Sequence, residues 1–268
     1  MQTIKYFLRP AWRLVANTLN FLWDARLNVT SPVKESGKEI FRIYDYGKVT
    51  RMRKRTFESK EPETLAWINS FDDEDNLIDI GANLGIYSLY AAYKGFNVIA
   101  IEPDALNYAL LNLNIRVNDF GERITPYCIA MHDVTTFSKF NISSYEWGGA
   151  LNSFDNTLDQ LGNQYQPIHS QGVFGLSLDS FLENLDIQPR HLKIDVDGNE
   201  YLILKGAIKT LKNQSLKSIL IELGEDLDSY KESISIIEQS GFKLIEKAHA
   251  EIYDNSPYST IYNHIFSR

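Results

Sequence analysis

Residues suited to ligand binding gather between positions 79 and 102. Asp79 lies at the carboxyl end of a short apolar stretch, and Gly81 and Gly85 then bracket a turn where a side chain would block a ligand from the backbone. Glu102 lies 17 positions after Gly85, where a strand–helix–strand nucleotide site places the acid that accepts ribose hydroxyls. This spacing predicts a site for a nucleotide-like cofactor.

The residues missing from this turn indicate which cofactor it binds. A dinucleotide site has a further glycine so that the pyrophosphate rests on a helix N-terminus, but Ala82 and Asn83 occupy the middle positions here. The chain also has no G-x-x-x-x-G-K-[ST] phosphate loop. A ligand with an adenosine and no phosphate fits better, and S-adenosylmethionine is the common one. The alternative is a glycine turn in an ordinary α/β domain.

We therefore expect one continuous set of cofactor contacts along this segment. Asp79 is expected near the methionine end of the cofactor and Glu102 on its ribose. The predicted contacts are Asp79, Gly81, Ala82, Asn83, Gly85, Glu102 and Pro103.

A second group of acids follows the apolar stretch 191–196. Asp195 falls at the carboxyl end of a predicted central parallel strand, which is where open α/β sheets bind their ligands. Methyl transfer is an in-line attack on a sulfonium methyl group, so much of the catalysis is positioning. If the acceptor is a hydroxyl, it must also lose its proton, which a carboxylate can accept directly or through a water. Asp195 is our first candidate for the base or the acceptor anchor, and Asp197 is the second.

A divalent metal is the competing interpretation of these acids. Asp195, Asp197 and Glu222, at the end of the next predicted strand, are hard oxygen ligands that could hold Mg²⁺ against an acceptor. Turn-forming Asp-Gly and an acid at a helix start are also explained without chemistry. We therefore assign no metal ligand from the sequence and place Glu222 on the substrate side.

Predicted strands and helices alternate through most of the chain. Apolar residues at helical spacing, with glycine or proline at the ends, predict helices over 62–71, 86–94, 178–185 and 202–211, with others after Glu102 and before Gly241. Short apolar runs predict strands near 77–80, 97–101, 124–129, 191–196, 218–223, 242–245 and 260–266.

Five colinear motifs between residues 56 and 224 resemble the FkbM family of methyltransferases. They are Lys-Glu-Pro-Glu-Thr-Leu-Ala-Trp-Ile (60–68), Asp-Ile-Gly-Ala-Asn-Leu-Gly (79–85), Ile-Glu-Pro-Asp (101–104), Lys-Ile-Asp-Val-Asp-Gly-Asn-Glu (193–200) and Leu-Lys-Gly-Ala (204–207). The resemblance implies an α/β class I S-adenosylmethionine-dependent methyltransferase fold. Such a fold is a Rossmann-like, mostly parallel seven-stranded sheet with helices on both faces and an antiparallel last strand. It also implies methylation of a hydroxyl, most often on a sugar or polyketide. By the same analogy Ala130 and Met131 line the adenine slot.

Residues 135–176 are predicted as a long connection rich in aromatic and small polar residues. Loops of this length are usually functional, and aromatic rings beside polar groups suit the mixed faces of a sugar. We interpret 145–154 as an acceptor lid, with Tyr145 and Trp147 as substrate contacts and Gly148-Gly149 as a flexible point. The alternative is a strand pair whose aromatic residues pack on the sheet.

Residues 1–58 are predicted as an extension before the cofactor-binding domain of 59–268. Residues 1–28 read as a basic amphipathic helix that docks on its own domain or a second subunit, or else contacts a membrane surface. The stretches 39–44 and 49–52 alternate like a strand pair with its turn at Gly47. The basic run 51–55 is then a solvated edge or attracts an anionic substrate.

Bulk composition limits the partners. The 268 residues carry a net charge of −8, which disfavours binding to a nucleic-acid phosphate backbone, so we expect a small-molecule or glycan substrate. The single cysteine, Cys128, cannot form an internal disulfide, and we expect it to be a buried thiol. These features suit a reducing compartment. We expect a cytoplasmic protein, at the inner face of the membrane if residues 1–28 bind it.

Overall fold

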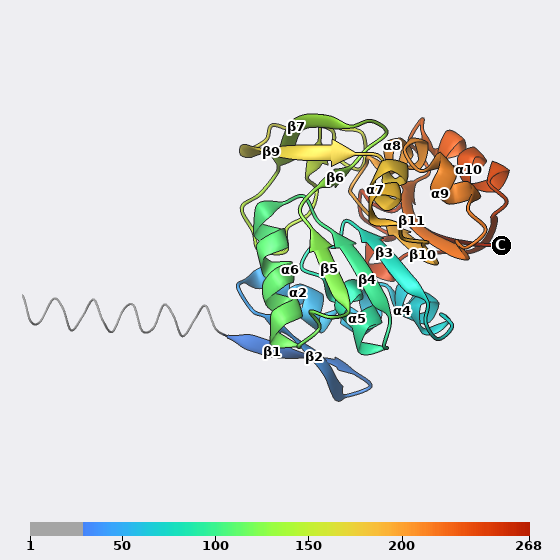
Figure 1. Cartoon of the computed structure of the whole chain (residues 1–268). Coiled ribbons are helices and arrows are strands. Elements are labelled where there is room, and N and C mark those ends of the chain that lie inside the picture. Colours follow the sequence, from blue (N-terminus) through green and yellow to red (C-terminus); the bar gives the residue numbers. More distant parts are fainter. Residues whose placement is uncertain (1–28) are drawn as a thin grey trace, which may run out of the picture.

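The computed structural model describes residues 29–268, and its centre is a mostly parallel sheet (Figure 1). Within this range the sheet has seven strands in the order β12-β13-β11-β10-β3-β4-β5. All neighbouring pairs from β11 to β5 are parallel, whereas β13 runs antiparallel to both β11 and β12. The predicted fold class and its antiparallel last strand are confirmed. The strands are β3 (Asn76–Ile80), β4 (Asn97–Ile101), β5 (Ile124–Tyr127), β10 (His191–Ile194), β11 (Ser218–Gly224), β12 (Lys243–Ala248) and β13 (Ile261–Ser267).

Helices cover both faces of this sheet because its central strands are apolar on both sides. Successive residues of a strand point to opposite faces, so Leu77 joins one core and Ile78 the other. The first core lies under α3 (Phe57–Lys60), α4 (Pro62–Asn69), α5 (Ile86–Tyr93) and α6 (Ala105–Val117). The second lies under α7 (Leu178–Leu185), α8 (Glu200–Lys205), α9 (Ile208–Lys212) and α10 (Tyr230–Gln239). The predicted helix 202–211 is thus divided into two.

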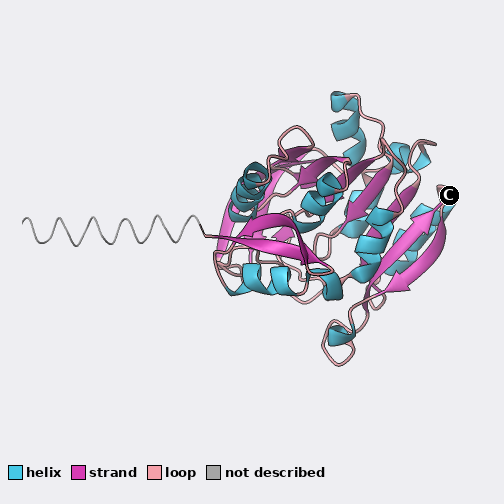
Figure 2. Cartoon of the chain, turned by 90° about the horizontal axis from the view of Figure 1, so that it is seen from below, coloured by secondary structure: helices cyan, strands magenta, loops and turns pink. Residues whose placement is uncertain are grey.

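The hairpin near the start of the described chain contains one of the two predicted strands, 39–44, but its partner is a different segment. β1 (Thr30–Glu35) pairs with β2 (Lys38–Tyr44), and Figure 2 shows this strand pair next to the grey trace. Both strands contribute to the first core, and β2 contacts α5 and α6. The predicted strand 49–52 is wrong, because it lies in the helix α2 (Lys48–Arg55). Thr50 accepts a hydrogen bond from the Gly47 N–H at 3.0 Å and so supports the first turn. The basic run ends this helix, where its dipole favours cations.

The predicted long connection contains a second sheet. Four strands pair in the order β6-β9-β7-β8 within the described chain. Phe140, Phe154 and Val173 form a small core between them with Ala130, so the alternative of aromatic residues packing on a sheet holds for these two rings. The strands are β6 (Ala130–Met131), β7 (Thr136–Ile142), β8 (Ser153–Phe154) and β9 (His169–Leu176).

The first strand of this second sheet also changes the surroundings of Cys128. The chain leaves the main sheet after Tyr127, two residues earlier than predicted, and enters β6 at Ala130. Cys128 lies in the link between them and is exposed, so the prediction of a buried thiol is wrong.

The predicted amphipathic helix of residues 1–28 lies outside the described residues. Across residues 29–268, no helix combines the length and apolar character that crossing a bilayer requires.

Candidate active site

Both glycines of the predicted cofactor turn have a positive φ and a neighbouring residue where a Cβ would lie. Gly81 has φ +85°, and a Cβ there would lie 1.8 Å from the backbone oxygen of Asp195. Gly85 has φ +91°, and a Cβ there would lie 2.4 Å from a methyl carbon of Leu111. The first glycine lets the turn after β3 approach the end of β10, and the second lets α5 start against α6. The turn is therefore built around close packing as well as around any ligand.

Glu102 holds the turn in place from the end of β4. One carboxylate oxygen accepts a hydrogen bond from the Asn83 N–H at 2.7 Å, and the other accepts one from the Asp104 N–H at 2.8 Å. The side chain is 5% exposed, and burial raises its pKa to about 8. Glu102 thus anchors the cofactor turn in addition to its predicted contact with a ribose.

Asp79 lies behind the turn. It is 1% exposed, and its Oδ2 accepts a hydrogen bond from the Ser88 hydroxyl at 2.5 Å, while its Oδ1 has no partner in the described chain. Burial raises its pKa, and the charge of Lys193, its register partner on β10, opposes that shift. The structure therefore places this acid in the support of the site.

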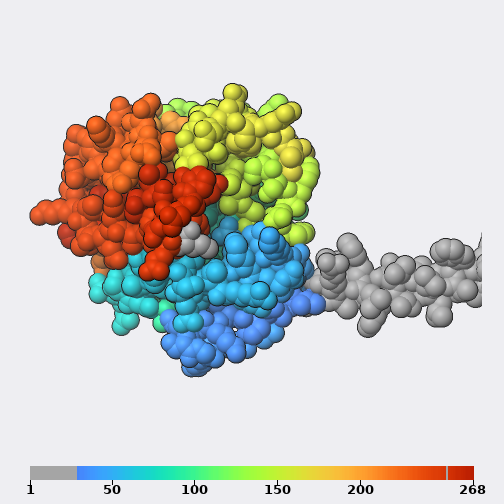
Figure 3. All heavy atoms as spheres, turned by 180° about the vertical axis from the view of Figure 1, so that it is seen from behind, coloured from blue at the N-terminus to red at the C-terminus, as the bar shows by residue number. Residues whose placement is uncertain are grey.

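A cavity of about 260 Å³ opens at the carboxyl ends of β3, β4, β10 and β11. Its walls come from segments far apart in the sequence, and Figure 3 shows the face where the helices after the hairpin (light blue) meet the segment before β13 (red). The predicted residues that line it are Gly81, Asn83, Glu102, Pro103, Asp195, Asp197 and Glu222. The predicted residues that do not line it are Asp79, Ala82, Gly85, Ala130, Met131, Tyr145 and Trp147.

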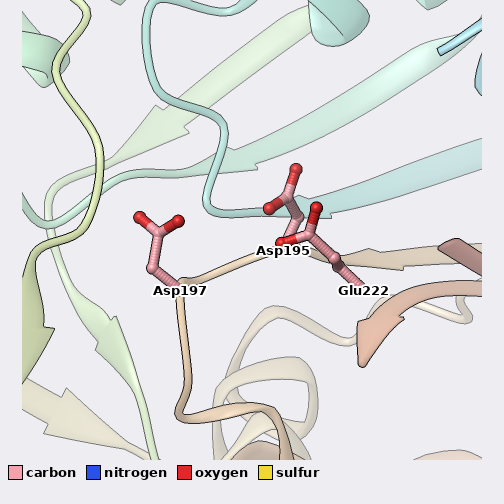
Figure 4. Close-up of side chains that lie close together, drawn as sticks. All are labelled: Asp195, Asp197 and Glu222. Atoms are coloured by element: carbon pink, nitrogen blue, oxygen red, sulfur yellow. The ribbon is translucent and has the colours of Figure 1, made fainter. Parts of the chain in front are cut away.

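Three carboxylates meet on the acid side of this cavity. One oxygen each of Asp195, Asp197 and Glu222 lies within 4.8 Å of the others, and Figure 4 shows them at the ends of β10 and β11. The Lys193 ammonium contacts Asp195 Oδ2 at 2.7 Å, and the Leu151 N–H donates to Asp197 Oδ2 at 2.6 Å. Burial, and then the charge of Asp195, raises the pKa of Asp197 to about 6 and that of Glu222 well above its ordinary value.

A partly buried ion pair just before α4 was not predicted as part of the site. Lys60 contacts Glu61 at 2.5 Å, and both line the cavity. Burial would raise the pKa of Glu61, but the charge of Lys60 outweighs it and lowers that pKa to about 2. Both residues belong to the motif 60–68, but an acid at a helix start has a structural explanation, so its position alone does not indicate a site residue.

The predicted acceptor lid is tied to the cofactor turn through its two glycines. Asn107 bonds the Gly148 N–H at 2.9 Å and the Gly149 oxygen at 3.0 Å, and Asn83 bonds the same Gly149 oxygen at 2.7 Å. Arg53 donates to the Gly148 oxygen at 3.0 Å. This pair of glycines is therefore a bonded junction and not the predicted flexible point.

The two aromatic residues of the predicted lid point elsewhere. Trp147 is half-buried against the ring of Tyr46, with 5.0 Å between ring centroids. Tyr145 is 63% exposed and lies 6.0 Å from the His169 ring. The part of this segment that lines the cavity is instead Gly149, Ala150, Leu151 and Asn152.

The remaining wall comes from residues near the C-terminus. Asn263 of β13 pairs in register with Glu222 and lines the cavity beside it. No sequence pattern singled out this wall, because its position depends on the antiparallel register of the last strand. Its other members are His249, Ala250, Tyr253, Tyr258 and Ile261.

The strand order, the antiparallel last strand and a cavity bounded by a glycine turn and strand-end acids define a class I methyltransferase. Residues 79–244 match the model of the Methyltransferase FkbM domain, and the chain belongs to this family.

Solved structures resemble this fold. FkbM methyltransferase from Methylobacillus flagellatus KT is 19% identical with a TM-score of 0.51, and the match covers 79% of this chain and 49% of that one. This chain thus spans about half the length of that structure. The tRNA m1G37 methyltransferase of M. jannaschii is 15% identical with a TM-score of 0.48, covering 89% and 54% of the two chains. A precorrin-6y C5,15-methyltransferase from Geobacter metallireducens GS-15 is 14% identical with a TM-score of 0.44, covering 78% and 86%. Among curated proteins, none matches this chain in sequence.

Proposed function

We propose that this chain is an S-adenosylmethionine-dependent O-methyltransferase that acts on a hydroxyl of a saccharide or a related natural product. The observation that carries the proposal is that one cavity holds both the glycine turn with Glu102 and the carboxylates of Asp195 and Asp197. A cofactor on the turn and an acceptor at these carboxylates would lie next to each other, as in-line transfer requires.

The donor groups of the cavity fit this cofactor. Five acidic side chains line it together with the cations Arg53 and Lys60, and their oxygens suit a ligand that carries sulfonium and ammonium groups. The bound cofactor supplies an electrophilic methyl group on its sulfonium. Glu102 would accept ribose hydroxyls with the lone pairs that its bond from the Asn83 N–H leaves, and Asn83 fixes the turn through its contact with the lid segment. The lining acids are Glu61, Glu102, Asp195, Asp197 and Glu222.

The acid side of the cavity supports a hydroxyl acceptor. Lys193 holds one oxygen of Asp195, which fixes the direction of this carboxylate as an acceptor anchor. Asp197 has a pKa of about 6, so it is ionised at neutral pH and more basic than an ordinary aspartate. The acceptor hydroxyl therefore passes its proton to one of these two carboxylates, directly or through a water.

The other polar groups of the cavity suit a saccharide better than a nucleic acid. Tyr253 and Tyr258 line the cavity with neutral hydroxyls, which can donate to and accept from sugar hydroxyls. The net charge of −8 disfavours a phosphate backbone.

The test is a screen of sugar and glycolipid acceptors with methyl-labelled cofactor. We expect wild-type protein to label at least one saccharide and the Asp195→Asn variant to do so at least about a hundredfold more slowly. Glu225→Gln, which alters an acid outside the cavity, serves as the matched control. Label transferred to RNA but to no saccharide would overturn the proposed acceptor class.

A further inference from the structure

We propose that Asp195, Asp197, Glu222 and Asn263 bind one divalent cation. The proposal needs only the geometry of these four side chains, although the role of the ion described below rests on the proposed function.

The separation of the three carboxylates suits a single ion. Ligands on opposite sides of an ion lie about 4.2 Å apart around Mg²⁺ and about 4.6–5.2 Å apart around Ca²⁺. One oxygen each of Asp195, Asp197 and Glu222 falls within 4.8 Å of the others, so one ion can contact all three after small side-chain rotations (Figure 4). Carboxylate oxygens are the ligands that such hard cations prefer.

Each of these carboxylates has an oxygen to spare. Lys193 contacts only Oδ2 of Asp195, and Leu151 donates only to Oδ2 of Asp197. Neither oxygen of Glu222 has a hydrogen-bond or ion-pair partner among residues 29–268. The cluster is therefore incomplete as a purely structural network.

Asn263 provides an independent indication of a ligand. Its register pairing with Glu222 on antiparallel strands puts both side chains on the same face of the sheet, and both line the cavity. The Nδ2 donates to Glu63 at 2.8 Å, which fixes the direction of the amide. Its Oδ1 is buried and has no partner in the described chain, although the residue is only 4% exposed. A carbonyl oxygen in this position suits a cation.

The nearby cations do not neutralise the cluster. Lys60 contacts Glu61, Lys193 contacts Asp195, and Arg53 donates to a backbone oxygen. In the part of the chain that the structure describes, no basic side chain therefore lies within ion-pair distance of Asp197 or Glu222. A bound cation would supply the missing positive charge.

In the proposed reaction the ion would activate the acceptor. Two neighbouring hydroxyls of the saccharide complete its coordination, and the ion lowers the pKa of the attacking hydroxyl. The hydroxyl loses its proton to a carboxylate or water, its oxygen forms a bond to the methyl carbon, and the bond from that carbon to sulfur breaks. The products are the methyl ether, the neutral thioether and one proton.

The test measures Mn²⁺ binding to the full-length, cofactor-free protein. Binding is detected as a decrease in the electron paramagnetic resonance signal of free Mn²⁺. We expect one site that Mg²⁺ or Ca²⁺ displaces. Glu222→Gln and Asp197→Asn should each weaken Mn²⁺ binding at least about tenfold. The control Glu225→Gln removes an acid three residues along from Glu222 that pairs with Lys247 outside the cavity, and its binding should equal wild type.

Two results would overturn the cation site. The first is wild-type protein that binds no Mn²⁺ at millimolar concentration. The positive charge next to the three carboxylates would then come from the cofactor and not from a metal ion. The second is a folded Glu222→Gln variant, with wild-type circular dichroism, that binds Mn²⁺ as well as wild type. Cofactor titration of the same samples separates this outcome from failure of the proposed function, since binding of S-adenosylmethionine without Mn²⁺ binding contradicts the cation site alone.

Discussion

Lys193 and Asp195 form a buried ion pair that joins the interior of the sheet to the cavity. The two residues are separated by one position and so point to the same face, with Nζ and Oδ2 2.7 Å apart. Lys193 is 1% exposed. Burial alone would lower its pKa, but the charges of Asp195 and Asp79 outweigh burial and raise it. The lysine thus fixes the Asp195 carboxylate and opposes the effect of burial on the pKa of Asp79.

Replacing this lysine is expected to destabilise the fold. Lys193→Met removes one partner of a buried pair and should lower the free energy of unfolding by about 3–5 kcal/mol, measured by urea denaturation. Lys209→Met is the control, because its pair with Glu183 is more than 70% exposed on both sides, and it should change stability by less than about 1 kcal/mol. Equal effects of the two variants would contradict the role assigned to Lys193.

The close approach of the cofactor turn to β10 makes Gly81 sensitive to a single methyl group. Gly81→Ala must overcome both its positive φ and the contact with the Asp195 oxygen, whereas Gly95→Ala meets only a positive φ, since nothing lies within 4 Å of its Cβ. We expect Gly95→Ala to cost about 1–2 kcal/mol and Gly81→Ala at least about 2 kcal/mol more in thermal or urea unfolding. A Gly81→Ala protein as stable as Gly95→Ala would show that the turn does not pack as described.

Stability is expected to fall as pH rises, in part because of Glu102. Its pKa is 4.5 in the unfolded chain and about 8 in the fold, so between these values the folded protein holds a proton that the unfolded chain has lost. This contribution is complete below pH 4.5 and is lost as pH rises to 8. Each unit of pKa difference corresponds to about 1.4 kcal/mol, so the total is at most a few kcal/mol.

Glu102→Gln tests this sign because its side chain cannot titrate. We expect the urea concentration at the unfolding midpoint of wild type to decrease as pH is raised from 5.5 to 8.5. The midpoint of the variant should decrease less. Some pH dependence should remain, because burial raises the pKa of Glu200 to about 7 in the same direction. Parallel pH profiles for the two proteins would exclude Glu102 as a source of the effect.

Trp147 is expected to matter for stability more than for the acceptor. It packs against Tyr46 and does not line the cavity, so Trp147→Ala should lower stability by about 1–3 kcal/mol through lost apolar contact. Tyr145→Ala, at an exposed position of the same segment, should change it by less than about 0.5 kcal/mol. A raised Michaelis constant for the acceptor with unchanged stability would instead restore the predicted lid contact.

The parts of the fold that were predicted correctly have strong local patterns. The strand, glycine turn, helix and strand over residues 76–101 are apolar and clearly punctuated, and the bounds of β4 and α7 agree with the prediction. The strand predicted for residues 49–52 was wrong because a pattern of only four alternating residues also fits one turn of a helix. The second sheet was missed because β6 and β8 have only two residues each, and because β7 and β9 mix polar with apolar residues and pair across a long distance in the chain.

In the candidate site, too, the residues with a local sequence pattern were predicted and those that depend on long-range pairing were not. The strand-end acids Asp195 and Glu222 could be found because parallel strands end at one edge of a sheet, which the alternation of elements reveals. Asn263 could not be found, because its place beside Glu222 depends on the register of β13. Ala130 and Met131 were assigned to the cofactor site by analogy with a longer strand of the main sheet. In this chain that strand ends earlier, and the two residues pack in the hydrophobic cores.

The central claim is that the glycine turn and Glu102 bind S-adenosylmethionine in the cavity that Asp195 shares. Calorimetric titration with this cofactor tests it most directly. We predict one bound molecule per chain in wild type and in the control Glu225→Gln, with affinity at least about tenfold weaker in Glu102→Gln. The absence of binding by folded wild-type protein at millimolar cofactor would contradict the claim.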